Sequence, residues 1–292
     1  MFYDWANSAY TMVVTSTIMS LYFLSSAGAA LTGKVADPAV TANAYWGFAN
    51  SAATLVLVVL SPILGTMADY KGKKKRMFQT FLFTGVVFTV LLALIPSNQW
   101  LLLLIAYVIT AIGFAGANIF YDAFLVDVAE DANMDRVSSL GFALGYIGST
   151  IPFIICMIFV VLATLGKAPF SVETAYKISF IITALWWMGF SIPILRDVHQ
   201  VYGIDAESHF VRNSFRRLGQ TLKEIRKHRH IFIFLLAYFF YIDGVDTIIK
   251  MATAYGSTIG IGSIMLLIIL LVTQFVAFPF AIIYGNSEPN GR

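Results

Sequence analysis

The stretch GTMADYKGKKKR, residues 65–76, separates two long apolar segments of the chain. It holds a glycine, an acid four positions later, a second glycine three positions after that, and then a run of basic residues. Glycine adopts the backbone conformations of tight turns and lets helices approach closely, and a carboxylate is stabilised at a helix N-terminus. The stretch therefore predicts a short charged turn between two helices, with Asp69 able to latch this end of the structure.

The segments that flank this turn are long and apolar enough to cross a membrane. Of the 292 residues 59% are hydrophobic and 12% are charged, against about 25% charged in a soluble domain. A spanning helix needs about 20 largely apolar residues. Eight windows qualify: 4–24, 45–67, 78–95, 100–122, 140–165, 178–194, 231–253 and 259–283. Such continuous runs exclude barrel strands, so the sequence predicts an all-α membrane protein, a helical bundle in a lipid bilayer.

The basic residues indicate how this bundle is oriented. They follow the second window, at Lys71 to Arg76, and fill the loop between the sixth and seventh windows, from Arg212 to Arg229. The opposite loops hold only Lys34, Lys167 and Lys177. By the positive-inside rule, both ends of the chain are expected on the cytoplasmic side. Juxtamembrane lysine clusters are explained by this topology and by anionic lipid, so we expect no nucleic-acid partner.

The longest loop divides the predicted spans into six and two. Within it Val211, Phe215, Leu218, Leu222 and Ile225 recur at helical spacing, with basic residues between them. This is the pattern of a helix that lies in the membrane interface. We therefore expect an N-terminal six-helix half at 1–195, a cytoplasmic linker with an amphipathic helix at 196–230, and the first two helices of a second half at 231–292.

No motif for catalysis or metal binding is recognisable in the chain. The histidines, His199, His209, His228 and His230, share one loop without an acid or cysteine at a ligand spacing, and nucleophile elbows, phosphate loops and zinc-protease motifs are missing from the sequence. We expect no enzyme activity, no cofactor and no metal.

Polar residues form a row along the first window and again along the seventh. The first row is Asp4, Asn7, Ser8 and Thr11, and the second is Asp243, Asp246, Thr247 and Lys250. Both have the spacing i, i+3, i+4 and i+7, which places four residues on one helix face. Chance is one explanation. A repeat is favoured because each row begins a possible transporter half.

Charged residues inside a membrane helix are costly, at about 2.5–3.5 kcal/mol on insertion scales, so they are expected to face a partner or a watery cavity. Asp243 lies near the middle of its window, which predicts a substrate or proton site there. An internal ion pair between Asp246 and Lys250 is the structural alternative. In the fourth window Asn118, Tyr121 and Asp122 share a face, for pore lining or for capping the cytoplasmic end.

The turn at 65–76 resembles the loop signature of the major facilitator superfamily, with Tyr70 in place of a basic residue. Three further motifs, YDWANSAY (3–10), SLGFALGYIGS (139–149) and YFFYIDGVDTII (238–249), resemble one branch of it. That branch contains the fungal vacuolar amino-acid effluxer linked to autophagy and its bacterial relatives. Gly141, Gly145 and Gly148 in the second motif would also allow close helix packing.

The resemblance implies a secondary transporter of amino acids or related small molecules that works by alternating access, with a central cavity between the first and seventh helices. The expected binding residues for substrate or proton are Asp4, Asn7, Ser8, Asn118, Asp122, Asp243, Asp246, Thr247 and Lys250. The expected cytoplasmic gate is Gly65, Asp69, Gly72, Lys74 and Arg76. Proton coupling is a hypothesis that depends on the intramembrane acids, and the short loops favour a bacterial inner membrane.

The chain departs from the family in its extent. Family members have twelve spans, whereas eight are expected here, and the sequence YGNSEPNGR (284–292) does not continue as a second signature loop. We expect a fragment or a truncated product, with a shift of frame near Asn286 as one explanation. The alternative function is therefore a non-transporting membrane scaffold or an inactive piece of a transporter.

Overall fold

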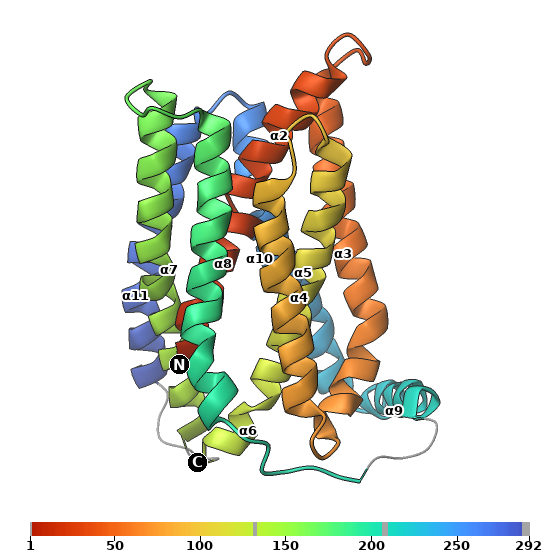
Figure 1. Cartoon of the computed structure of the whole chain (residues 1–292). Helices are drawn as coiled ribbons and strands as arrows, with labels where there is room; N and C mark the ends of the chain where they lie inside the picture. Colours follow the sequence, from red (N-terminus) through yellow and green to blue (C-terminus); the bar gives the residue numbers. More distant parts are fainter. Residues whose placement is uncertain (1, 131–132, 206–209, 288–292) are drawn as a thin grey trace.

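The computed structural model describes residues 2–130, 133–205 and 210–287 of the chain. Over these residues the protein is a bundle of long helices that run side by side (Figure 1). Eight segments are long and apolar enough to cross a membrane. This confirms the predicted number of spans and the all-α architecture.

The first span is divided into α1 (Phe2–Tyr10), a π-helical turn η1 (Thr11–Thr15) and α2 (Ile18–Leu31). The other spans are α3 (Pro38–Asp69), α4 (Lys74–Leu94), α5 (Trp100–Ala123), α7 (Met134–Thr164), α8 (Val172–Asp197), α10 (Arg229–Thr258) and α11 (Ser263–Ser287). Two shorter helices, α6 (Leu125–Val128) and α9 (Phe210–Ile225), lie at one end of the bundle (Figure 1).

Local sequence signals set several helix ends. α3 begins where the Asp37 side chain accepts a hydrogen bond from the Val40 amide at 3.0 Å, with proline at the first helical position, a common N-terminal arrangement. The predicted start of the last span at Ile259 is wrong. Gly260 has φ +88°, a left-handed conformation that forms a turn, and α11 therefore begins at Ser263.

The core of the bundle is aromatic and lies among the first six spans. Its largest fully buried side chains include Trp46, Trp187, Tyr10 and Tyr107. Tyr107 donates a hydrogen bond to the Asn50 side chain at 2.7 Å, which joins α5 to α3. α1 packs between α7 and α8, whereas α10 packs on α2 and α3 and α11 packs on α7. The start of the chain is thus deeply embedded in the bundle.

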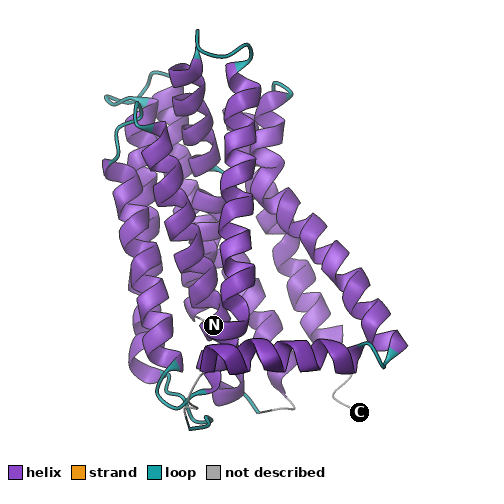
Figure 2. Cartoon of the chain, turned by 90° about the vertical axis from the view of Figure 1, so that its right-hand side faces the viewer, coloured by secondary structure: helices purple, strands orange, loops and turns teal. Residues whose placement is uncertain are grey.

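The amphipathic helix predicted in the long loop is present as α9. It runs across the ends of the spans rather than along them (Figure 2) and contacts α3 and α10. Ser214 is buried on the bundle side, and Phe215 and Leu218 are exposed. The basic turn at 71–73 lies at the same end of the molecule as α9 (Figure 1), so the two basic clusters of the sequence share one face of the bundle.

Candidate functional site

The polar row of the first span lies in α1 and meets the polar residues of α5. The Asn7 side chain donates a hydrogen bond to the Asn118 side-chain oxygen at 2.8 Å, and the Tyr121 hydroxyl donates to the Asp4 carboxylate. The Ser8 hydroxyl donates to the Asn7 oxygen at 3.4 Å. These bonds bring the predicted groups of the first and fourth spans together, with Asn118 and Tyr121 of α5 facing α1.

The glycines of α7 make room for this polar row. A Cβ atom on Gly141 would lie 2.6 Å from the Asp4 carboxylate, and one on Gly145 would lie 2.5 Å from the Ser8 hydroxyl. A Cβ atom on Gly148 would meet the ring of Trp5 at 2.5 Å. The close packing that the sequence predicted for these glycines is confirmed, and α1 is the helix on which they pack.

A cavity of about 550 Å³ opens beside the start of α1. Its polar lining includes Asp4, Tyr121 and Asp122, and Asp197 adds a third carboxylate. Apolar side chains form much of the remaining wall, among them Phe2, Val137, Phe142 and Ile194. Carboxylates that share one cavity repel each other when ionised, so the geometry is suited to a proton or to the positive group of a solute.

The first span is interrupted immediately after the polar row. After the π-helical turn, Thr17 has φ −133° and ψ −86°, which interrupts the helical ladder. Side chains satisfy part of the freed backbone: Thr17 donates to the Met12 carbonyl, and Thr253 of α10 donates to the Ser16 carbonyl. Interrupted membrane helices occur where backbone lines a cavity or is buried in protein. The sequence reasoning missed this break, for which only a cluster of threonine and serine gives a signal.

The second polar row has different surroundings. Asp246 and Lys250 form the ion pair that was predicted as the structural alternative, with 2.5 Å between the carboxylate and the ammonium. The Lys250 ammonium is also 3.4 Å from the Thr54 hydroxyl. Asp243 and Thr247 are exposed on α10.

Asp243 does not line the cavity that holds Asp4. In the described residues the two acids therefore do not share this cavity, in contrast to the central cavity expected between the first and seventh helices. The physical reason is the packing of α10, which lies against α2 and α3, while α1 lies between α7 and α8.

Directly after the charged turn, the first residue of α4 forms a buried ion pair with α6. The Lys74 ammonium is 2.6 Å from the Asp127 carboxylate, and their side chains are 4% and 0% exposed. Lys74 also donates to the Ala123 carbonyl at 2.8 Å. The Asp127 side chain accepts two further bonds from the amides of Val201 and Tyr202, at 2.9 and 3.0 Å.

The Asp127 carboxylate carries a strongly stabilised charge. Its burial opposes ionisation, but the hydrogen bonds from Lys74 and from the backbone of Tyr202 and Val201 outweigh this and hold its pKa below the ordinary value. Asp127 thereby connects the start of α4 to the segment after α8. The sequence gives no spacing signal for this contact, because its partners are far apart in the chain.

The remaining predicted gate residues differ in their surroundings. Gly72 has φ +69°, the left-handed conformation of a tight turn, as predicted. Gly65 was expected to allow close helix approach, but a Cβ atom there would meet nothing within 4 Å among the described residues, so that expectation is wrong. Asp69 and Arg76 are exposed, and the Asp69 carbonyl accepts a hydrogen bond from the Ile204 amide at 2.8 Å.

The eight long apolar helices define a multi-pass helical membrane protein, and similarity to an MFS-type transporter assigns it to the major facilitator type. The family described as "Vacuole effluxer Atg22 like" matches residues 1–134 and 126–285. The chain belongs to this family.

The curated relatives agree with this assignment. The chain is 56% identical over 284 residues to "Uncharacterized MFS-type transporter YxiO" of Bacillus subtilis, covering 97% of this chain and 65% of that protein. It is 28% identical over 131 residues to "Autophagy-related protein 22-1" of Aspergillus niger, and this match covers 42% of this chain and 20% of the relative. The match to "Autophagy-related protein 22" of Yarrowia lipolytica is 27% over 153 residues, 45% and 25% of the two chains.

The chain therefore spans less than two thirds of the length of these relatives. No solved structure matches it significantly.

Proposed function

We propose that the protein is a secondary transporter that moves small solutes, amino acids or related metabolites, by alternating access. The observation that carries the proposal is the acidic cavity beside α1, where Asp4 and Asp122 share a mostly apolar space next to a broken span. A mostly apolar pocket with a few convergent polar groups suits a small molecule. In this proposal residues 1–195 are one half, 196–230 the linker, and 231–292 the beginning of a second half.

Proton coupling is the second part of the proposal, with Asp4 as the proton-binding residue. Intramembrane carboxylates are frequent members of proton relays in transporters. Tyr121 donates to the Asp4 carboxylate, and Asp122 lines the same cavity. Binding of a proton, or of a cationic group of the solute, relieves the repulsion between the two carboxylates.

Transport is tested with the purified chain in lipid vesicles, by uptake of radiolabelled amino acids after a pH gradient is imposed. The Asp4→Asn variant is expected to lose gradient-driven uptake and to retain exchange, which needs no net proton movement. Asp37→Asn is the matched control, because Asp37 caps α3 outside this cavity. If Asp4→Asn leaves gradient-driven uptake intact, the coupling role is wrong.

The same assay separates transport from the alternative function. The Bacillus subtilis relative serves as a positive control in parallel vesicles. If the relative accumulates a solute and this chain neither accumulates nor exchanges it, a non-transporting scaffold or an inactive piece of a transporter is favoured.

We further propose that the face carrying α9 is cytoplasmic in a bacterial inner membrane, with the N-terminus on that side. The support is the charge asymmetry of the loops and the position of α9 at the end where the basic turn lies (Figure 1). Cysteines introduced by Lys73→Cys and Gln220→Cys should resist a membrane-impermeant thiol reagent in intact cells, whereas Ser171→Cys should react. The reverse labelling would overturn the orientation.

A further inference from the structure

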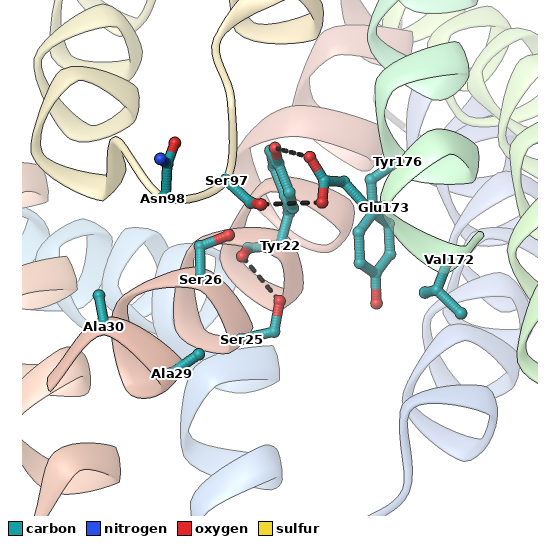
Figure 3. Close-up of a pocket in the computed structure, with 10 residues that line it drawn as sticks. All are labelled: Tyr22, Ser25, Ser26, Ala29, Ala30, Ser97, Asn98, Val172, Glu173 and Tyr176. Atoms are coloured by element: carbon teal, nitrogen blue, oxygen red, sulfur yellow. Dashed lines mark hydrogen bonds between the residues drawn. The ribbon is translucent and has the colours of Figure 1, made fainter. Parts of the chain in front are cut away.

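A second cavity, of about 540 Å³, lies at the end of the bundle opposite α9. It is formed by α2, the turn between α4 and α5, and the start of α8 (Figure 3). It shares no lining residue with the cavity around Asp4. Nothing in the transport proposal uses it.

Three hydroxyl groups of this cavity, those of Tyr22, Ser25 and Ser97, already direct their protons to acceptors of the protein. Ser97 donates to one Glu173 oxygen at 2.8 Å, and Ser25 donates to the Tyr22 carbonyl at 2.9 Å. The Tyr22 hydroxyl is directed to the Ile95 carbonyl and to the other Glu173 oxygen, each at 3.4 Å. A hydroxyl that has donated its proton can still accept. These three oxygens and the Glu173 carboxylate are therefore acceptors on the wall, beside the Asn98 amide and the Tyr176 hydroxyl.

The Ser26 hydroxyl differs from those of Tyr22, Ser25 and Ser97 in its hydrogen bonding. Ser26 is 6% exposed, and its hydroxyl has no hydrogen-bond partner in the described structure. Figure 3 shows this hydroxyl directed toward the side where Ser97 and Tyr22 lie. A buried polar atom without a partner lowers stability, and a ligand that supplies a donor would give the Ser26 oxygen a partner.

The charge of the cavity comes from Glu173, which is paired with Lys177 at 2.7 Å. The two residues are one helical turn apart, with the Lys177 side chain 26% exposed and the Glu173 side chain 38% exposed. Partly exposed pairs of this kind are weak because water competes with them. Another ammonium group could therefore replace Lys177 at Glu173 with little loss.

We propose that this cavity binds small organic ammonium compounds, primary amines with a short apolar body. The ammonium donates to Glu173, Ser97 and Ser26, because three N–H donors match a wall of acceptors. The apolar body lies against Ala29, Ala30 and Val172, which line the remaining wall. The proposal concerns binding alone, so it does not depend on transport.

The probe that tests it is n-butylammonium, measured by isothermal titration with the purified full chain in detergent micelles. Butyltrimethylammonium carries the same charge without an N–H donor and should bind at least about tenfold more weakly, because charge-assisted hydrogen bonds are lost. Glu173→Gln should weaken n-butylammonium binding by at least about tenfold, and Ser26→Ala should weaken it severalfold. Lys177→Gln should strengthen it, because the competing ammonium is removed.

Control variants and a folding measurement test whether the binding belongs to this cavity. Asp37→Asn, at the N-cap of α3 and outside both cavities, should leave n-butylammonium binding unchanged. Near-ultraviolet circular dichroism shows whether Glu173→Gln folds, and Ser26→Ala provides an independent test if it does not. Absence of n-butylammonium binding to the wild-type chain, or binding that Ser26→Ala and the quaternary probe leave unchanged, would overturn the proposal. Either result leaves the transport proposal untouched, since that depends on the Asp4 cavity.

Discussion

The polar rows of α1 and α10 have the same spacing in the sequence and opposite surroundings in the structure. In the first span 78% of the most apolar window is buried inside the bundle, and in α10 none of that window is buried. Asn7 and Asp4 of α1 bond to side chains of α5. Asp246 of α10 bonds to Lys250 of its own helix.

The spacing of polar residues along a helix therefore does not show by itself which row forms a binding site. Spacing fixes which residues share a helix face, but the neighbouring helices decide what that face contacts. Glycines of α7 pack closely on α1, and an amide and a hydroxyl group of α5 form hydrogen bonds with it. In the described residues α10 has no comparable match for Asp243. Paired variants, one at a buried and one at an exposed position, test whether burial accounts for the difference between these regions.

The largest expected difference is between the two lysine–aspartate pairs. Lys74→Met leaves the buried Asp127 charge without its partner, which typically costs about 3–5 kcal/mol. Lys250→Met removes the partner of a half-exposed carboxylate, which costs about 1 kcal/mol or less. The measurement is the free energy of unfolding in mixed detergent micelles.

A double variant provides the control for the buried pair. Lys74→Met combined with Asp127→Leu removes both charges, so it should recover part of the stability lost in the single variant. Equal losses for Lys74→Met and Lys250→Met would show that burial does not separate the two regions.

The same buried pair predicts a pH dependence of stability, smaller than the loss in Lys74→Met. Because the pKa of Asp127 is lowered in the folded chain, its contribution is complete above the ordinary aspartate pKa of about 3.9. It is lost as the pH falls through the lowered value. Unfolding measured from neutral to acidic pH should show this acid-sensitive component in the wild type and lack it in Asp127→Asn. Identical profiles would contradict the assignment.

Paired glycine variants test the packing directly. In Gly148→Ala the new methyl group would meet three ring atoms of Trp5 within 2.8 Å, and overpacking of this kind costs about 1–3 kcal/mol. In Gly244→Ala of α10 the new methyl group meets nothing within 4 Å among the described residues, and the variant should lose no stability. The measurement is the free energy of unfolding of both variants. An equal loss of stability in Gly244→Ala and Gly148→Ala would contradict the difference in surroundings between α10 and α7.

The sequence predicts the spans, the amphipathic helix and the Asp246–Lys250 pair because each depends on apolar run length or on spacing within one helix. It identifies Asp4 and Asn118 as polar positions, but their contact depends on how α1 packs against α5. The Lys74–Asp127 pair could not be predicted, since its partners are distant in the chain, and for the break near Thr17 the sequence offers only a cluster of threonine and serine as a signal. Among the described residues, a Cβ atom on Gly65 would meet nothing within 4 Å, and the sequence gives no signal for this because it does not place the neighbouring helices.

The smallest expected effect concerns the single described hydrogen bond between α10 and the break in the first span. Thr253→Val keeps the shape of the side chain and removes the hydroxyl that donates to the Ser16 carbonyl, which should cost about 0.5–1.5 kcal/mol. Thr273→Val in α11 is the control, because the Thr273 hydroxyl bonds only to carbonyls of its own helix. If the bond holds α10 against the break, Thr253→Val should also speed amide exchange around Ser16, which Thr273→Val should not. Unchanged exchange at Ser16 in Thr253→Val would mean that the first span holds its broken shape without α10.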